Sequence, residues 1–126
     1  MNTISYIWEL PQNLLGLLIK KIFKKKINLV FKYADREVTI VKSNTFTGIS
    51  LGKYIILAER FNTLQTVRHE YGHCIQSHIL GPLYLPIVGA LSLTWNLLAR
   101  VNKYFSKTYY KRFPENWADK LGGVVR

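Results

Sequence analysis

The sequence predicts one small α+β domain, in which a sheet of short strands packs against helices. The chain has 126 residues, about the length of a single compact domain. Apolar residues make up 48% of it, which is enough for a core and excludes the composition of a disordered chain. Runs rich in β-branched residues occupy the middle third, with helical apolar patterns before and after them. This segregation of strands and helices favours an α+β fold.

The first half of the chain predicts a helix followed by strands. Residues 4–23 carry apolar side chains at helical spacing, with a break or a new start near Pro11. The next two apolar runs are separated only by Ala34 and Asp35, which is typical of a β-hairpin. The expected strands are residues 27–33, 36–42, 45–51 and 53–58, forming a mixed or antiparallel sheet.

The second half predicts three helices. The first starts after Asn62 or Thr63, either of which can cap it, and stops at Gly81. Residues 83–101 are almost free of charge, so they fit a buried core helix or a membrane-inserted one, and interruptions such as Pro86, Gly89 and Asn96 favour the core helix. A last short helix begins at Pro114 and runs through Lys120.

The first of these helices contains an HExxH motif, His69-Glu70-Tyr71-Gly72-His73. The two histidines lie about 40° apart on one helix face, one turn from each other, so both imidazoles can bind one zinc ion. Glu70 is beside that face and is suited to act as a general base on a zinc-bound water. The motif therefore supplies two ligands and one catalytic carboxylate.

A catalytic zinc site normally has a third protein ligand. The extended metzincin motif is excluded, because Gln76 and Ile79 stand where that motif has glycine and histidine. His78 is the only other histidine, and on the same helix it projects about 180° away from His69. The third ligand must therefore be a carboxylate from elsewhere in the chain.

Only two carboxylates follow the HExxH helix, Glu115 and Asp119. Four residues apart on a helix they share a face, so Glu115 can bind the metal while Asp119 hydrogen-bonds a ligand histidine and fixes its tautomer. An alternative for Asp119 is a salt bridge to Lys120 or Arg126. The predicted metal ligands are thus His69, His73 and Glu115. Glu70 is the predicted general base, and Asp119 is predicted to hydrogen-bond a ligand histidine.

These motifs resemble those of known metallopeptidases. The ExxxD pattern is similar to the second motif of the thermolysin-like gluzincins. A closer resemblance is to the minimal zincin-like metallopeptidase domains of bacterial toxin-like and repeat proteins, which share HEYGHxxQS, GxxYL and ExWA, here residues 69–77, 81–85 and 115–118. It covers residues 45–123 as a zincin core and leaves residues 1–44 outside. The resemblance implies a zincin-like fold and a zinc-dependent hydrolase of peptide or protein substrates.

The charge of the chain keeps other functions open. Eighteen Lys and Arg against seven Asp and Glu give a net charge of +11, which attracts anionic membranes or nucleic acid. The lysines of residues 20–26 follow an apolar segment, a pattern compatible with peripheral binding to anionic lipid. No nucleic-acid-binding motif accompanies the charge, so nucleic acid is the weaker alternative. In either alternative the protein is a basic, non-enzymatic binder on a degenerate zincin scaffold.

The sequence also bears on compartment and on the transition state. The single cysteine, Cys74, allows no internal disulfide. Glu9 and Pro11 interrupt the first apolar segment, so we predict no cleavable signal peptide and expect a cytoplasmic or membrane-associated protein. A donor to a transition-state oxyanion is not singled out by the sequence. The candidates are Tyr84, Tyr109, Tyr110 and Arg112.

Overall fold

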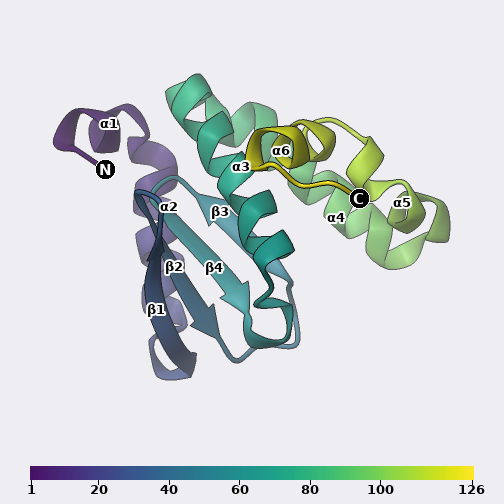
Figure 1. Ribbon diagram of the computed structural model, residues 1–126, viewed down its shortest axis with the longest axis horizontal. Coiled ribbons are helices and arrows are strands. Elements are labelled where there is room, and N and C mark those ends of the chain that lie inside the picture. The colour runs from purple at the N-terminus through teal and green to yellow at the C-terminus, as the bar shows by residue number, and fades with distance from the viewer.

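The computed structural model describes residues 1–126 as a four-stranded sheet with six α-helices (Figure 1). The predicted α+β class is confirmed. A 3₁₀ turn at Gly81–Leu83 and a π-helical turn at Leu85–Gly89 join the third helix to the fourth. The elements are α1 (Thr3–Trp8), α2 (Leu10–Ile22), β1 (Ile27–Tyr33), β2 (Arg36–Val41), β3 (Gly48–Leu51), β4 (Tyr54–Ala58), α3 (Leu64–Leu80), α4 (Ala90–Val101), α5 (Lys103–Lys107) and α6 (Glu115–Gly122).

The sheet is mixed, with strand order β1-β2-β4-β3. The hairpin of β1 and β2 turns at Ala34, whose φ of 53° is the left-handed conformation that such a tight turn requires. β4 lies parallel to β2 and antiparallel to β3. As a result β3, which follows the long loop after β2, forms one edge of the sheet.

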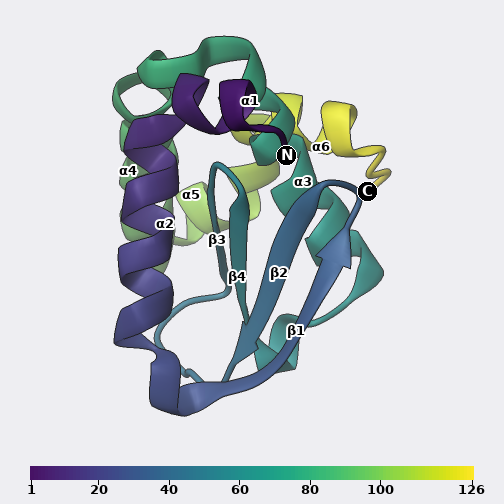
Figure 2. The ribbon, with the colours of Figure 1, turned by 90° about the vertical axis from the view of Figure 1, so that its left-hand side faces the viewer.

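Helices cover both faces of this sheet. α3 packs on one face, where Val67 and Cys74 join the buried side chains of β2 and β4 in the core. α2 contacts β3 and β4 from the opposite face (Figure 2). Residues 4–23 form two helices that meet at Glu9, in agreement with the predicted break near Pro11, and Pro11 lies in the first turn of α2, where its missing N–H is not needed.

The inner side of α2 is polar. Glu9, Gln12 and Asn13 are fully buried, whereas the leucines of this helix face outward. The Glu9 carboxylate pairs with Arg36 at 3.1 Å and accepts a hydrogen bond from Ser77 of α3. The side chain of Gln12 also donates to Ser77 and to the Gly81 carbonyl, at 2.8 Å each. These bonds tie α2 to the sheet and to α3 through polar groups rather than through apolar packing.

The expectation of a buried core helix over residues 83–101 is wrong. None of the residues of α4 is buried, and Leu93 and Leu97 are 59% and 53% exposed. The helix packs mainly against α5, and its inner side carries polar groups such as Ser92. No single helix is long and apolar enough to cross a membrane. The stretches 64–83 and 85–101, bent at 118° to each other, pass that test only as a pair, by length and composition.

The buried ion pair predicts that two carboxylates that contact Arg36 contribute very different amounts to the free energy of unfolding. Glu9→Gln should lower the free energy of unfolding by about 3 kcal/mol or more, because it leaves the buried Arg36 guanidinium without its buried counter-charge. Asp35→Asn is the matched control, since Asp35 contacts Arg36 from a half-exposed position and should cost less than about 1 kcal/mol. Urea unfolding measures both. Equal effects would contradict the assignment of Glu9 as the main partner.

Candidate metal centre

The centre is built first on α3. The Thr63 side chain caps this helix by accepting a hydrogen bond from the Thr66 N–H, as one of the two predicted caps. His69 and His73 lie one turn apart on its buried side, each only 5% exposed. Their rings pack edge to face with centroids 4.8 Å apart. The two imidazoles predicted to act together therefore lie side by side.

The backbones of α3 and α6 come into direct contact beside these histidines (Figure 1). A Cβ atom at Gly72 would lie 1.9 Å from the carbonyl oxygen of Ala118, and one at Gly122 would lie 1.9 Å from that of Arg68. No side chain fits at either position. Glycine within the HExxH helix and glycine at the end of α6 thus allow an approach that any other residue would prevent.

This approach brings the Glu115 carboxylate to both histidines. Its Oε2 atom lies 2.9 Å from Nε2 of His69 and 2.9 Å from Nε2 of His73. The three ligand atoms of this buried group lie within 4.8 Å of one another, so the group could hold a metal ion. His78 lies outside it, on the exposed side of α3 near Glu9.

Hydrogen bonds at the far nitrogens fix the tautomers of both histidines. Nδ1 of His69 donates to Asp119 Oδ1 at 2.6 Å. Nδ1 of His73 lies 2.7 Å from Gln76 Oε1, and it must donate, because the Gln76 amide nitrogen donates to the Pro114 carbonyl. With both rings neutral, each Nε2 atom carries a lone pair toward Glu115, so three acceptors converge on one point and fit a bound cation. A proton on Nε2, shared with the Glu115 carboxylate, can take the place of that cation.

The electrostatics of the group agree with this. Burial opposes protonation of His73, but the hydrogen bond and the charge of Glu115 outweigh it and raise the pKa of His73 to about 9. Burial would raise the pKa of Glu115, yet hydrogen bonds from the two histidines outweigh it and hold that pKa well below its usual range. Positive charge at the centre of the group is therefore favoured.

Asp119 performs both of the roles that the sequence left open. Besides accepting from His69, it is bound by Arg126, with the guanidinium Nε 2.6 Å from Oδ2. Arg126 also lies over the ring of Tyr110, 3.3 Å from its centroid, and Tyr110 packs edge-on against His69. The C-terminal residue of the chain thus supports the carboxylate that orients a ligand histidine.

Glu70 lies between α3 and the edge strand β3. Its carboxylate Oε2 accepts a hydrogen bond from the Ser50 hydroxyl at 2.5 Å. A Cβ atom at Gly48 would lie 3.0 Å from the other carboxylate oxygen of Glu70, so the strand leaves room for this side chain. Glu70 is buried and makes no contact with Lys or Arg. Its only hydrogen-bond donor is therefore a neutral hydroxyl group.

Two residues of the centre were not predicted. Gln76 contacts His73, and its spacing of three residues from this histidine on one helix face could have indicated the contact. Ser92 of α4, whose hydroxyl donates to Glu115 Oε1, gave no signal at all. Its position depends on how α4 packs, which the sequence pattern misjudged.

The four candidate oxyanion donors lie in different environments in the structure. Tyr84 is buried and its hydroxyl donates to the Ser50 carbonyl at 2.9 Å. Arg112 lies among the rings of α4 and α5, away from the ligands. Tyr109 and Tyr110 line a pocket of about 450 Å³ between the segment before β3 and the helices α4 and α5. Tyr110, in contact with His69, brings this pocket next to the metal-ligand group.

Comparisons of the chain with protein-family models, with curated proteins and with solved structures found no match. The function must therefore be argued from the chemistry of the centre itself and from the motifs that form it.

The contact of α3 with α6 predicts two effects of Gly72→Ala, because the new methyl group forces the helices apart. The variant should bind added Zn²⁺ at least about tenfold more weakly, and its free energy of unfolding should be lower by about 1–3 kcal/mol. Gly89→Ala is the matched control, since its Cβ meets only ordinary contacts at 3.5–4.0 Å. A chromophoric chelator competition and urea unfolding measure the two effects. Unchanged metal affinity in Gly72→Ala would contradict the role given to this contact.

Proposed function

We propose that the protein is a zinc-dependent metallopeptidase of the gluzincin type, with a zincin-like fold. The observation that carries this proposal is the convergence of His69 Nε2, His73 Nε2 and Glu115 Oε2 in a buried group, with Glu70 beside it on the same helix. The mixed sheet, the HExxH helix and the second helix that supplies a carboxylate support the fold assignment.

The donor set supports zinc among the divalent metals. Two neutral imidazoles and one carboxylate are a common protein ligand set of catalytic zinc, which keeps a fourth position for water. His69, His73 and Glu115 would hold the ion. Zinc, when bound, supplies a Lewis acid that lowers the pKa of water. Asp119 and Gln76 keep each ligand histidine in the tautomer that leaves Nε2 unprotonated.

Glu70 is the residue proposed to move the proton. A carboxylate whose only partner is the neutral Ser50 hydroxyl keeps lone pairs free to accept a proton from the attacking water. The same group then protonates the leaving amine, as a general acid–base must in peptide hydrolysis. The Ser50 hydroxyl and the space at Gly48 hold the carboxylate in position.

The surroundings of the centre support an extended peptide as the substrate. β3 is an edge strand, paired only with β4; its other side has no strand partner, although the Ser50 carbonyl accepts a hydrogen bond from the buried Tyr84 hydroxyl, and Gly48 and Ile49 are the less buried part of the strand. An extended chain can add to such an edge through main-chain hydrogen bonds. Ser50 of β3 contacts Glu70, and Tyr110 of the adjoining pocket contacts His69. A peptide along β3 would therefore pass the catalytic groups.

The ligand assignment predicts about one zinc per chain, lost in His73→Ala. His78→Ala is the matched control, because it removes a histidine of the same helix that lies outside the ligand group. Elemental analysis of protein purified without added metal gives the stoichiometry. Glu115→Ala should also lose zinc, and if that variant keeps full affinity, the third ligand has been wrongly assigned.

Glu70→Gln separates the base from the ligands. Zinc should remain bound, while cleavage of a fluorogenic peptide library should fall about 100-fold or more, because the amide cannot accept the proton. Glu59→Gln changes a carboxylate at an exposed position with the same loss of charge, and it should leave the rate unchanged. Zinc content and cleavage are measured on the same samples. A Glu70→Gln variant with undiminished turnover would refute the mechanism.

A further inference from the structure

The outer face of α2 is apolar although its inner face is polar. Leu14, Leu18 and Ile22 follow one another along the exposed side, with 55% of Leu18 and 71% of Ile22 accessible to solvent. Gln12 and Asn13 point inward and are fully buried. A helix on the surface of a water-soluble domain shows the opposite distribution, with its apolar stripe toward the core. The outer face of α2 is therefore matched to an apolar neighbour.

α4 repeats this distribution. Ser92 points inward to Glu115, and Trp95 donates from its indole N–H to the Phe113 carbonyl. The outward side chains are mostly apolar, and half or more of Leu93, Leu97 and Val101 is exposed. Contiguous apolar surface of this kind marks an interaction site.

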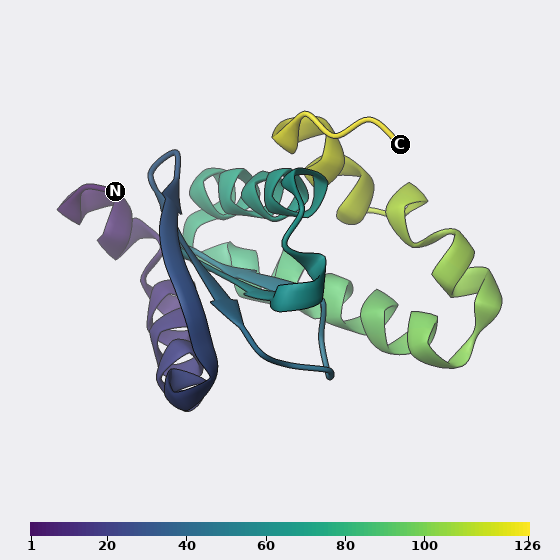
Figure 3. The same ribbon diagram turned by 60° about the horizontal axis from the view of Figure 1, so that its bottom comes forward.

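The two helices lie on the same side of the molecule. In Figure 2 α4 lies behind α2, and Figure 3 shows both helices on the lower side of the molecule, away from α3 and α6, with α4 extending to the right. We call the exposed apolar residues of α2 and α4 on this side the α2/α4 face. The metal-ligand group on α3 and α6 is not part of it.

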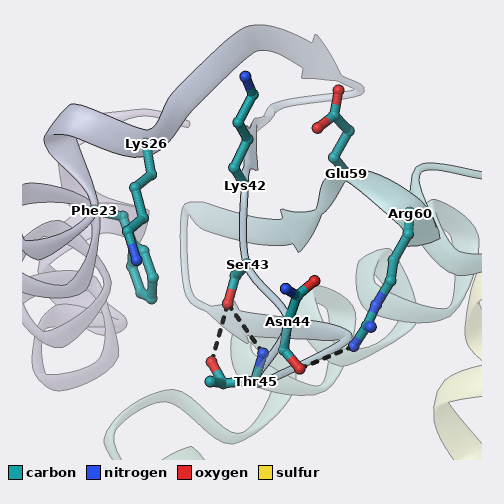
Figure 4. Close-up of a pocket in the computed structure, with 8 residues that line it drawn as sticks. All are labelled: Phe23, Lys26, Lys42, Ser43, Asn44, Thr45, Glu59 and Arg60. Atoms are coloured by element: carbon teal, nitrogen blue, oxygen red, sulfur yellow. Dashed lines mark hydrogen bonds between the residues drawn. The ribbon is translucent and has the colours of Figure 1, made fainter.

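Positive charge gathers where both helices end. Lys20 is paired with Glu37, but the lysines of residues 21–26 are exposed after α2, and exposed basic residues follow α4 from Arg100 to Lys111. No acidic residue occurs in residues 10–34 or 71–114. The pocket in Figure 4 lies at the end of α2, where Lys26 is joined by Lys42 and Arg60 against the single carboxylate of Glu59.

We propose that the α2/α4 face docks on the surface of an anionic lipid bilayer. The apolar side chains enter the boundary between headgroups and acyl chains, and the basic residues at the helix ends contact the lipid phosphates. Charge complementarity selects this occupant over a second copy of the chain. Two copies of net charge +11, facing each other through surfaces whose exposed charges are mostly basic, would repel.

Sedimentation with vesicles tests the apolar part of the proposal. The protein should bind phosphatidylcholine vesicles that contain phosphatidylglycerol at low salt, at least about tenfold more strongly than phosphatidylcholine alone. Leu18→Ser with Ile22→Ser should weaken this binding at least about tenfold. Leu64→Ser with Val125→Ser removes two apolar side chains that are just as exposed but lie on α3 and at the C-terminus, and it should leave binding within about twofold. Circular dichroism verifies that each variant is folded.

A second pair of variants tests the charge. Lys24→Gln with Lys25→Gln should weaken binding about tenfold or more, whereas Lys32→Gln with Lys120→Gln, an equal change of charge on β1 and α6, should have little effect. Raising the salt should weaken binding of the unmodified protein. The proposal is overturned by no binding to anionic vesicles at low salt or by equal losses in the control variants. A dimer in solution that Leu18→Ser with Ile22→Ser separates would also overturn it, since a second copy would then cover the face.

Discussion

The contact between the α3 and α6 backbones at Gly72 and Gly122 is the constraint on which the metal-ligand group depends. Packed helices are ordinarily held about 8–10 Å apart by the side chains between them. Here the carbonyl oxygens of Ala118 and Arg68 occupy the places of the two missing side chains. The Glu115 carboxylate, in the first turn of α6, then reaches the Nε2 atoms of both histidines of α3 without a loop to position it. The bond from Gln76 to the Pro114 carbonyl anchors α6 at that end, and the bond from His69 to Asp119 anchors it one turn later.

The distribution of acids follows from the same architecture. Of the seven acidic residues, Glu9, Glu70, Glu115 and Asp119 are buried, and three of these four surround the ligand histidines. Most of the negative charge of the chain therefore lies inside, close to α3, while the Lys and Arg side chains remain largely at the surface. A buried carboxylate is tolerated only where a cation or hydrogen-bond donors accompany it. Glu9 forms an ion pair with Arg36, and Asp119 forms one with Arg126. Glu115 contacts only the histidines and the Ser92 hydroxyl. Glu115 and Glu70, which has only the Ser50 hydroxyl, are thus the two buried acids without an arginine partner, and a cation among the candidate ligand atoms would give Glu115 its counter-charge.

The sequence could predict the parts of this structure that depend on local pattern. Some features depend only on residues that are close in the sequence: the hairpin at Ala34, the cap at Thr63 and the spacing of His69 and His73. The helices and strands that contain them formed close to the expected bounds. The α+β class could be predicted for the same reason. The environment of α4 could not, because an uncharged run has the same pattern whether its apolar side faces a core, a lipid or solvent. The contact of Ser92 depends on tertiary packing, because a polar residue inside an apolar run does not indicate its partner. The contact of Gln76 with His73, by contrast, lies on one face of α3 and could have been predicted. The break of the first helix near Pro11 was predicted, but the inward position of the Glu9 carboxylate was not, since its partner Arg36 comes from the sheet.

α4 connects the two surfaces of the molecule that the proposals concern. On its inner side Ser92 donates to Glu115 Oε1, the oxygen that does not face the histidines. On its outer side the neighbouring residues Leu91 and Leu93 are exposed. Because one helical turn carries both sets of side chains, a displacement of α4 by anything bound to its apolar face moves the hydroxyl that orients the carboxylate ligand. α4 also borders, through Asn96 and Arg100, the pocket that reaches Tyr110 beside His69. The helix that the sequence pattern assigns to the core is therefore the element that joins the apolar face proposed to dock on a bilayer to the candidate metal ligand Glu115 and to the pocket beside it.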